Sequence, residues 1–161
     1  MDLGVAGRSF VIVGGTTGMG YGAATELARD GANVALLARD ADRARARAAI
    51  LADEYGVHAV GIAADGTRRD GSLDDAIAQA EAELGPLRGL AVTAGPMHQQ
   101  GPFVEHGDDS WDWYYEVILM MTVRACRAAI PRLAANGGGT IVTTAAYSVR
   151  APKVLIPPYT S

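Results

Sequence analysis

Glycine residues are concentrated between the first apolar run of the chain, residues 10–13, and the first helical pattern. Glycine allows a tight turn and lets a pyrophosphate approach the backbone without a Cβ atom in the way. The helix that follows offers free N–H groups and the positive end of its dipole to the same phosphates. We therefore predict a nucleotide-binding loop at residues 14–20, the alternative being a glycine-rich turn without a ligand. Its candidate contact residues are Gly14, Thr16, Thr17, Gly18, Met19 and Gly20.

A basic residue follows the second apolar run. Arg39 comes just after residues 34–37 and lies 19 positions beyond Gly20. A carboxylate at the end of this strand would hydrogen-bond a ribose 2′-hydroxyl and repel a 2′-phosphate, whereas a guanidinium pairs with that phosphate through two parallel N–H groups. Arg39 thus favours NADP(H) over NAD(H). The alternative is an arginine that is exposed to solvent at the start of the next helix.

Short apolar runs alternate with longer helical patterns along the chain. The runs are continuous, which is typical of a parallel sheet that is covered by helices on both faces. Their alternation with helices predicts a doubly wound, Rossmann-like α/β fold with strand order 3-2-1-4-5 and the glycine loop at the carboxyl end of the first strand. Strands are expected at residues 10–13, 34–37, 59–63, 90–92 and 141–142, and helices at residues 20–30, 40–55, 72–84 and 110–135.

Cap and turn residues mark the ends of the predicted helices. Asp40 can cap the second helix, and Asp109 or Ser110 can cap the longest one. Gly31 is expected to end the first helix, because glycine readily takes the positive φ found at helix C-termini. Pro131 lies inside the longest helical pattern, where a proline kinks or shortens a helix.

Composition restricts the class of protein. The 161 residues are 49% hydrophobic and 20% charged, which is typical of a globular protein with a sizeable core. The formal charge of −4 argues against a general nucleic-acid binder. No signal peptide is apparent, and the apolar run at residues 117–123 is too short to span a bilayer. The single cysteine, Cys126, allows no internal disulfide and fits a reducing cytoplasm. No metal site is expected, because His58, His98 and His106 lack the spacing of metal ligands.

Residues 14–20 have the spacing Gly-x-x-x-Gly-x-Gly, which resembles the glycine motif of short-chain dehydrogenases/reductases, and the similarity continues to residue 161. Asp65 matches the acidic residue that contacts adenine in that family. Ala94 and Gly95 match the second half of the family's Asn-Asn-Ala-Gly motif. The resemblance implies an oxidoreductase that transfers a hydride between the nicotinamide of NADP(H), less readily NAD(H), and a carbonyl or alcohol substrate.

The resemblance also implies how the chain would assemble and which further segments would complete it. It implies a homo-oligomer formed through the long helix at residues 110–135, and a substrate pocket that is shaped in part by residues 96–107. Full-length relatives continue past this region with further helices and strands. We therefore expect residues 1–161 to be one NAD(P)-binding Rossmann domain that lacks its C-terminal part.

Proton transfer in the family depends on four side chains. A tyrosine gives or takes the proton, a lysine four residues later favours its anion, a serine steadies the substrate oxygen, and an asparagine holds a water. Tyr159 aligns with the tyrosine, whereas Ala146 and Ile118 stand at the serine and asparagine positions. Thr144 and Ser148 flank Ala146 and could supply a hydroxyl group instead. The lysine would stand at position 163, after the end of the sequence.

Two functions fit these residues. The first is an NADP(H)-dependent oxidoreductase with Tyr159 as its general acid and base, favoured by that tyrosine and by the intact glycine loop. The second is a non-catalytic nucleotide-binding or interaction protein, favoured by Ala146 and Ile118. Residues 1–161 by themselves are expected to bind the adenosine half of the cofactor without turnover.

Overall fold

A parallel β-sheet forms the centre of the protein in a computed structural model that describes residues 3–95 and 97–160. Its five strands lie in the order β3-β2-β1-β4-β5, and each neighbouring pair is parallel. Both the order and the direction confirm the predicted doubly wound sheet. The strands are β1 (Ser9–Val13), β2 (Asn33–Ala38), β3 (Ala59–Ala63), β4 (Leu87–Val92) and β5 (Thr140–Thr143).

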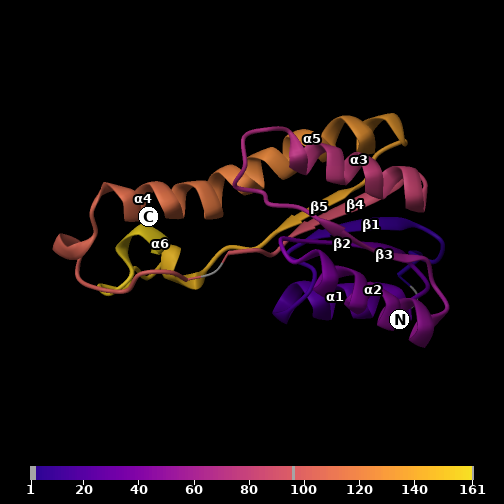
Figure 1. Ribbon diagram of the computed structural model, residues 1–161, viewed down its shortest axis with the longest axis horizontal. Coiled ribbons are helices and arrows are strands. Elements are labelled where there is room, and N and C mark those ends of the chain that lie inside the picture. Colours follow the sequence, from indigo (N-terminus) through magenta and orange to yellow (C-terminus); the bar gives the residue numbers. More distant parts are fainter. Residues whose placement is uncertain (1–2, 96, 161) are drawn as a thin grey trace.

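Helices cover both faces of the sheet, as Figure 1 shows. The helices on one face are α1 (Gly18–Arg29) and α2 (Ala41–Tyr55), and those on the other are α3 (Ser72–Leu84) and α5 (Met121–Ala135). Successive residues of β1 alternate between the two layers, because Ile12 packs with α1 and α2 while Val11 and Val13 pack with α3 and α5. Both sides of the strand therefore need apolar side chains, which explains the continuous apolar runs.

The predicted ends of the first two helices are confirmed. Gly31, with a φ of +82°, turns the chain after α1. The carboxylate of Asp40 accepts a hydrogen bond of 2.9 Å from the backbone N–H of Arg43 and so caps α2. Between these two turns, β2 pairs with β1 in a register that runs from Ser9 opposite Asn33 to Val13 opposite Leu37.

The predicted cap of the long helix is wrong. Its first segment, α4 (Asp108–Tyr114), begins after Gly107, and neither Asp109 nor Ser110 precedes it. The Ser110 hydroxyl is instead hydrogen-bonded to Nδ1 of His106 at 3.0 Å, and both side chains are buried. A buried contact therefore overrides the local preference of serine for a helix cap.

The long helix is continuous but not uniform. A π-helical segment, η2 (Tyr115–Met120), separates α4 from α5. Pro131 lies inside α5, and the helix continues to Ala135, so the proline does not end it. The helix runs past the carboxyl edge of the sheet (Figure 1). Neither it nor any other helix in the described ranges is long and apolar enough to cross a membrane.

The segments that follow β4 and β5 lie beside each other beyond the sheet. They contain the short elements η1 (Phe103–Glu105), η3 (Tyr147–Val149) and α6 (Pro157–Thr160). The N–H of Gly101 donates to the carbonyl of Leu155 at 2.8 Å, and the Tyr114 hydroxyl donates to the carbonyl of Gln99 at 3.0 Å. Helix α6 packs against α4 (Figure 1), so the two segments are joined to each other and to the long helix.

There is no room for a side chain at Gly14, in the turn between β1 and α1, or at Gly20, in the first turn of α1. Gly14 has a φ of +84°, and a Cβ atom there would lie 2.8 Å from the Cβ of Ala94. A Cβ atom at Gly20 would overlap the carbonyl oxygen of Gly14 and the hydroxyl of Thr93. The start of α1 is therefore pressed against the ends of β1 and β4.

Replacing Gly20 with alanine is expected to destabilise the protein by about 1–3 kcal/mol, the usual cost of overpacking. The matched control is Gly22→Ala in the same helix, because a Cβ atom at Gly22 meets no atom within 4 Å. Alanine is the better helix former, so this control should gain about 0.5–1 kcal/mol. Urea unfolding of both variants measures the difference, and equal stabilities would contradict the close packing at Gly20.

Candidate cofactor-binding and active site

The start of α1 presents hydrogen-bond donors at the carboxyl edge of the sheet. Thr17 occupies the N-cap position, and its side chain makes no capping hydrogen bond. The first turn contains no acidic side chain that would neutralise the positive end of the helix dipole. Gly18 has a φ of +52°, and Met19 is 69% exposed, whereas Thr16 is only 6% exposed. An anion can therefore reach the N–H groups of this turn from solvent.

Thr93 fastens the end of β4 to the end of β1. Its N–H and its hydroxyl both donate to the carbonyl of Val13, at 3.0 and 3.1 Å. The next residue, Ala94, touches Gly14, so the glycine loop and the residues after β4 are in direct contact. Thr93 stands where the Asn-Asn-Ala-Gly motif has its second asparagine, and it was not among the expected site residues. The signal that could have found it is a short hydroxyl side chain at the end of a central strand.

Arg39 lies where β2 ends, at the same edge of the sheet. It is exposed, and no acidic side chain in the described ranges pairs with it. The neighbouring Asp40 is engaged elsewhere, because its carboxylate caps α2 and lies 3.4 Å from the guanidinium of Arg43. The guanidinium of Arg39 is thus available to an anionic ligand.

Asp65 lies close to Arg39, because the N–H of Ala64 donates to the carbonyl of Ala38 at 2.8 Å as the two strands end. One carboxylate oxygen, Oδ1, accepts hydrogen bonds from the backbone N–H and the hydroxyl of Thr67, at 3.0 and 2.7 Å. The other oxygen, Oδ2, accepts none from any described residue. The side chain is therefore oriented by its own turn and keeps one free acceptor.

Tyr159 lies in α6, beyond the carboxyl edge of the sheet. Its ring is half-buried and meets the ring of Tyr114 edge to face, with 6.0 Å between the centroids. Its backbone N–H donates to the carbonyl of Ile156 at 3.1 Å. The hydroxyl makes no hydrogen bond to any residue in the described part of the chain, so it can bond a ligand.

Two hydroxyl groups flank Ala146, and the structure distinguishes them. Thr144 is exposed, and its hydroxyl donates to the carbonyl of Val92 at 3.3 Å. Ser148 is 6% exposed, and its Oγ atom has no hydrogen-bond partner among the described residues. Ser148 lies in η3, which packs against α6, the helix that carries Tyr159. A buried hydroxyl without a partner is uncommon in folded proteins and so marks Ser148 as a candidate for ligand binding.

Ile118 lies in η2 and faces the residues after β4. Its Cδ1 atom lies 3.3 Å from the position that a Cβ atom on Gly95 would occupy. The position where the family has a polar asparagine is therefore next to the candidate cofactor-binding residues, but its side chain here is apolar.

A cavity of about 500 Å³ lies between the segments that follow β4 and β5. Its lining includes Met97, Gln100, Lys153, Leu155 and Ile156. The segment at residues 96–107, expected to shape the substrate pocket, thus contributes two of these residues, while Pro96 itself lies outside the described ranges. Within those ranges, no three His, Cys, Asp or Glu side chains are grouped as metal ligands would be.

The chain is similar to proteins of known family in both sequence and structure. The model of the short chain dehydrogenase family matches residues 8–161. A short chain dehydrogenase of Pseudocercospora fijiensis is 28% identical over 160 residues, which cover 96% of this chain and 50% of that protein. The structure of L-sorbose reductase from Gluconobacter frateurii, complexed with NADPH and L-sorbose, is similar with a TM-score of 0.92 and 31% identity, over 99% of this chain and 60% of that chain.

A structure of NAD⁺-bound xylitol dehydrogenase has a TM-score of 0.91 at 19% identity, over 97% of this chain and 59% of that chain, and this likeness concerns the fold alone. The chain spans 50% of the length of the fungal relative and 60% of that of the sorbose reductase. The family model covers nearly all of the chain, and the parallel sheet carries its glycine loop at the carboxyl end of β1. The chain therefore belongs to the short-chain dehydrogenase family.

Proposed function

We propose that the protein is an NADP(H)-dependent oxidoreductase that transfers a hydride between the nicotinamide and a carbonyl or alcohol carbon. The observation that carries this proposal is the glycine loop at the end of β1, next to an Arg39 that pairs with no acidic side chain in the described ranges. The NADPH-bound reductase of G. frateurii supports the same cofactor. NAD(H) is the less favoured alternative in this proposal, because Arg39 stands where a carboxylate would bind its ribose. Residues 1–161 act as one dinucleotide-binding domain, and the single cysteine, Cys126, fits the cytoplasm as its location.

The chain offers a partner for each part of the adenosine half of NADP(H). The free N–H groups at the start of α1, with the Thr17 hydroxyl, would hold the pyrophosphate. Arg39 would pair with the 2′-phosphate, and Oδ2 of Asp65 would accept from the adenine amino group. Gly14 and Gly20 would keep the start of α1 packed against the ends of β1 and β4, which places these N–H groups at the edge of the sheet. When bound, the cofactor supplies or accepts the hydride.

Arg39→Ala should remove most of a preference for NADPH over NADH in the full-length protein. A charge-assisted contact contributes roughly 1.5–3 kcal/mol, so we expect NADPH affinity to fall about tenfold to a hundredfold and NADH affinity to stay unchanged. Calorimetric titration with both cofactors measures this. Arg45→Ala is the matched control, because Arg45 is exposed on α2 and pairs with Asp42. Equal affinity of the parent protein for both cofactors would refute the role of Arg39.

Tyr159 would give its hydroxyl proton to the substrate oxygen as the hydride reaches the carbonyl carbon. We propose that Ser148 donates a hydrogen bond to the same oxygen, in place of the hydroxyl that Ala146 lacks. Two observations support this role: the Oγ atom of Ser148 is buried without a partner among the described residues, and η3 packs against α6. A lysine at position 163, one helical turn beyond Tyr159, would stabilise the tyrosine anion.

Ser148→Ala is expected to lower kcat for carbonyl reduction about a hundredfold to a thousandfold, the usual effect of removing one donor to a developing oxyanion. Thr144→Val is the control, because the Thr144 hydroxyl already bonds the carbonyl of Val92. It should leave kcat close to that of the parent. Steady-state assays of NADPH consumption at 340 nm give both values. An unchanged kcat in the Ser148 variant would show that another group stabilises the oxyanion.

Ala146 and Ile118 favour the second function, a non-catalytic nucleotide-binding or interaction protein. Neither side chain can donate a hydrogen bond, and Ile118 places an apolar group next to Gly95. One experiment on the full-length protein separates the two functions. NADPH consumption is followed with a broad panel of carbonyl compounds, and NADPH binding is measured in parallel. Turnover supports the enzyme, whereas binding without turnover on any member of the panel supports the non-catalytic function.

We further propose that the protein forms a homo-oligomer through the long helix, residues 110–135. Tyr115, Leu119 and Ile130 support this, because they are exposed apolar side chains on that helix. Leu119→Glu should therefore reduce the mass that sedimentation velocity measures. Ile50→Glu changes an equally exposed residue of α2 on the opposite face of the sheet and serves as control. A parent protein that sediments as a monomer would contradict this interface.

A further inference from the structure

An arginine of the long helix is bonded to the turn that follows β3. The guanidinium of Arg124 donates to the carbonyls of Gly66 and Thr67, at 3.0 and 3.4 Å. It also donates to Oε2 of Glu116 at 2.6 Å, and its side chain is only 13% exposed. One side chain thus joins the turn at residues 66–67 to two successive parts of the long helix, η2 and α5.

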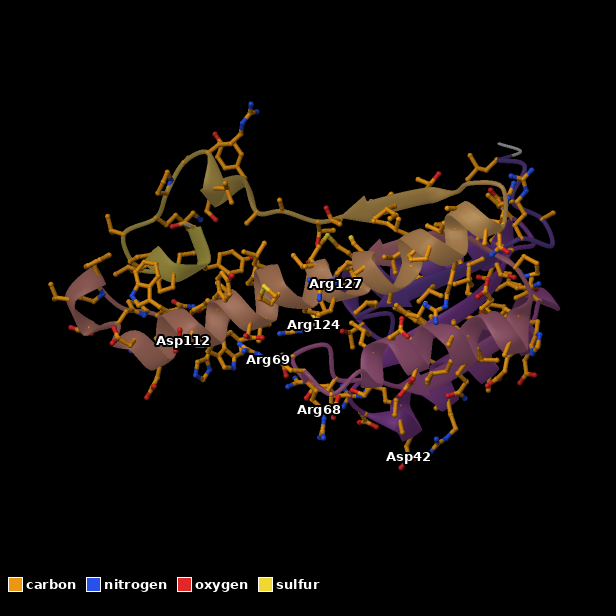
Figure 2. The ribbon with its side chains drawn as sticks, turned by 90° about the horizontal axis from the view of Figure 1, so that it is seen from above. Asp42, Arg68, Arg69, Asp112, Arg124 and Arg127 are labelled. Carbon is orange, nitrogen blue, oxygen red and sulfur yellow. The ribbon has the colours of Figure 1, made fainter. Side chains whose placement is uncertain are left out.

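Glu116 connects a second arginine to this contact. Its other carboxylate oxygen, Oε1, forms an ion pair with Arg69, which lies just beyond the same turn. Figure 2 shows Arg69 and Arg124 approaching each other between the helix and the turn. The hydrogen bond from Arg124 holds the pKa of Glu116 below its ordinary value, with Arg69 adding to the effect while burial opposes it. Glu116 therefore stays ionised at neutral pH, and its bonds are charge-assisted.

The backbone of the turn also lies directly on the helix. Gly66 is buried, and a Cβ atom there would overlap the side chain of Met121. This contact sets the distance between the turn and α5, and the bonds from Arg124 fix its position along the helix. We call the set of Gly66, Glu116, Met121 and Arg124 the turn clasp.

The turn clasp acts on the residues that orient Asp65. The carbonyl of Thr67 accepts from Arg124, while the N–H and hydroxyl of Thr67 donate to Oδ1 of Asp65. Displacing Thr67 would therefore rotate the carboxylate and move its free oxygen, Oδ2. Arg124, which holds Thr67 in place, lies on the long helix, 59 positions further along the chain than Asp65.

We propose that Arg124 is a positioning residue for cofactor binding: through the turn clasp it holds Oδ2 of Asp65 where it can accept from the adenine amino group. This inference rests on the proposed NADP(H)-binding function. It concerns only the adenine end of the cofactor. Among the described residues, no hydrogen bond joins the turn clasp to the glycine loop or to the start of α1. Arg124 itself need not touch the cofactor.

Arg124→Met in the full-length protein should weaken binding of NADPH, and of its adenine half, adenosine 2′,5′-bisphosphate, by the same factor. One misplaced hydrogen bond corresponds to about a threefold to tenfold loss. Reduced nicotinamide mononucleotide, which lacks adenine, should bind as to the parent. Arg124→Lys, which keeps the charge but not the planar fork, should give an intermediate loss. Glu116→Gln, a variant that keeps the side-chain shape, should weaken the adenine half in the same direction.

The matched control is Arg127→Met. Arg124 and Arg127 both line a cavity of about 540 Å³, but Arg127 makes no hydrogen bond or ion pair in the described ranges. It should bind all three ligands as the parent does. Equal affinities of the parent and Arg124→Met for adenosine 2′,5′-bisphosphate would overturn the inference while leaving the proposed function intact. Equal losses for both halves of the cofactor would also overturn it, because they would indicate a general structural role. A parent that binds none of these ligands would overturn the proposed function and the inference together.

Discussion

The parallel direction of the five strands is the constraint on which the candidate site depends. Parallel neighbours need a crossover through a helix, so every strand ends at the same edge of the sheet. That edge gathers the glycine loop after β1, Arg39 after β2, Asp65 after β3 and Ala94 after β4. The loop can lie so close to β4 because Gly14 has no side chain and because Thr93 bonds the carbonyl of Val13.

The ion pairs that the described residues form around this edge distinguish arginines that are bound to a carboxylate from one that is not. Asp40 is committed to the start of α2 and to Arg43, which leaves Arg39 for a ligand. Glu116 is committed to Arg69 and Arg124, and the guanidinium of Arg124 is held against the turn with its side chain only 13% exposed. Arg39, Arg69 and Arg124 have the same side chain, and they differ in whether a carboxylate of the described residues pairs with them.

Sequence patterns could predict the structural elements that are determined by residues close together in the chain. The strands and the turn at residues 14–20 follow from apolar runs and glycine spacing, and the structure confirms the sheet that they imply. The bonds of Thr93 to Val13 and of Arg124 to Gly66 join residues 80 and 58 positions apart, so no local pattern could reveal them. The start of the long helix was predicted wrongly for a different reason, because the sequence does not show that Ser110 and its near neighbour His106 are buried together and bond each other.

The most direct test of hydride transfer follows a labelled hydride through the full-length protein. NADPH that carries deuterium at the transferring C4 position is incubated with the protein and a panel of carbonyl compounds, and the alcohol products are examined by mass spectrometry. An NADP(H)-dependent oxidoreductase will place deuterium on the new carbinol carbon, in proportion to the NADPH oxidised. Tight binding of NADPH with no deuterium in any alcohol would contradict the proposed hydride transfer and would identify the protein as a non-catalytic member of its family.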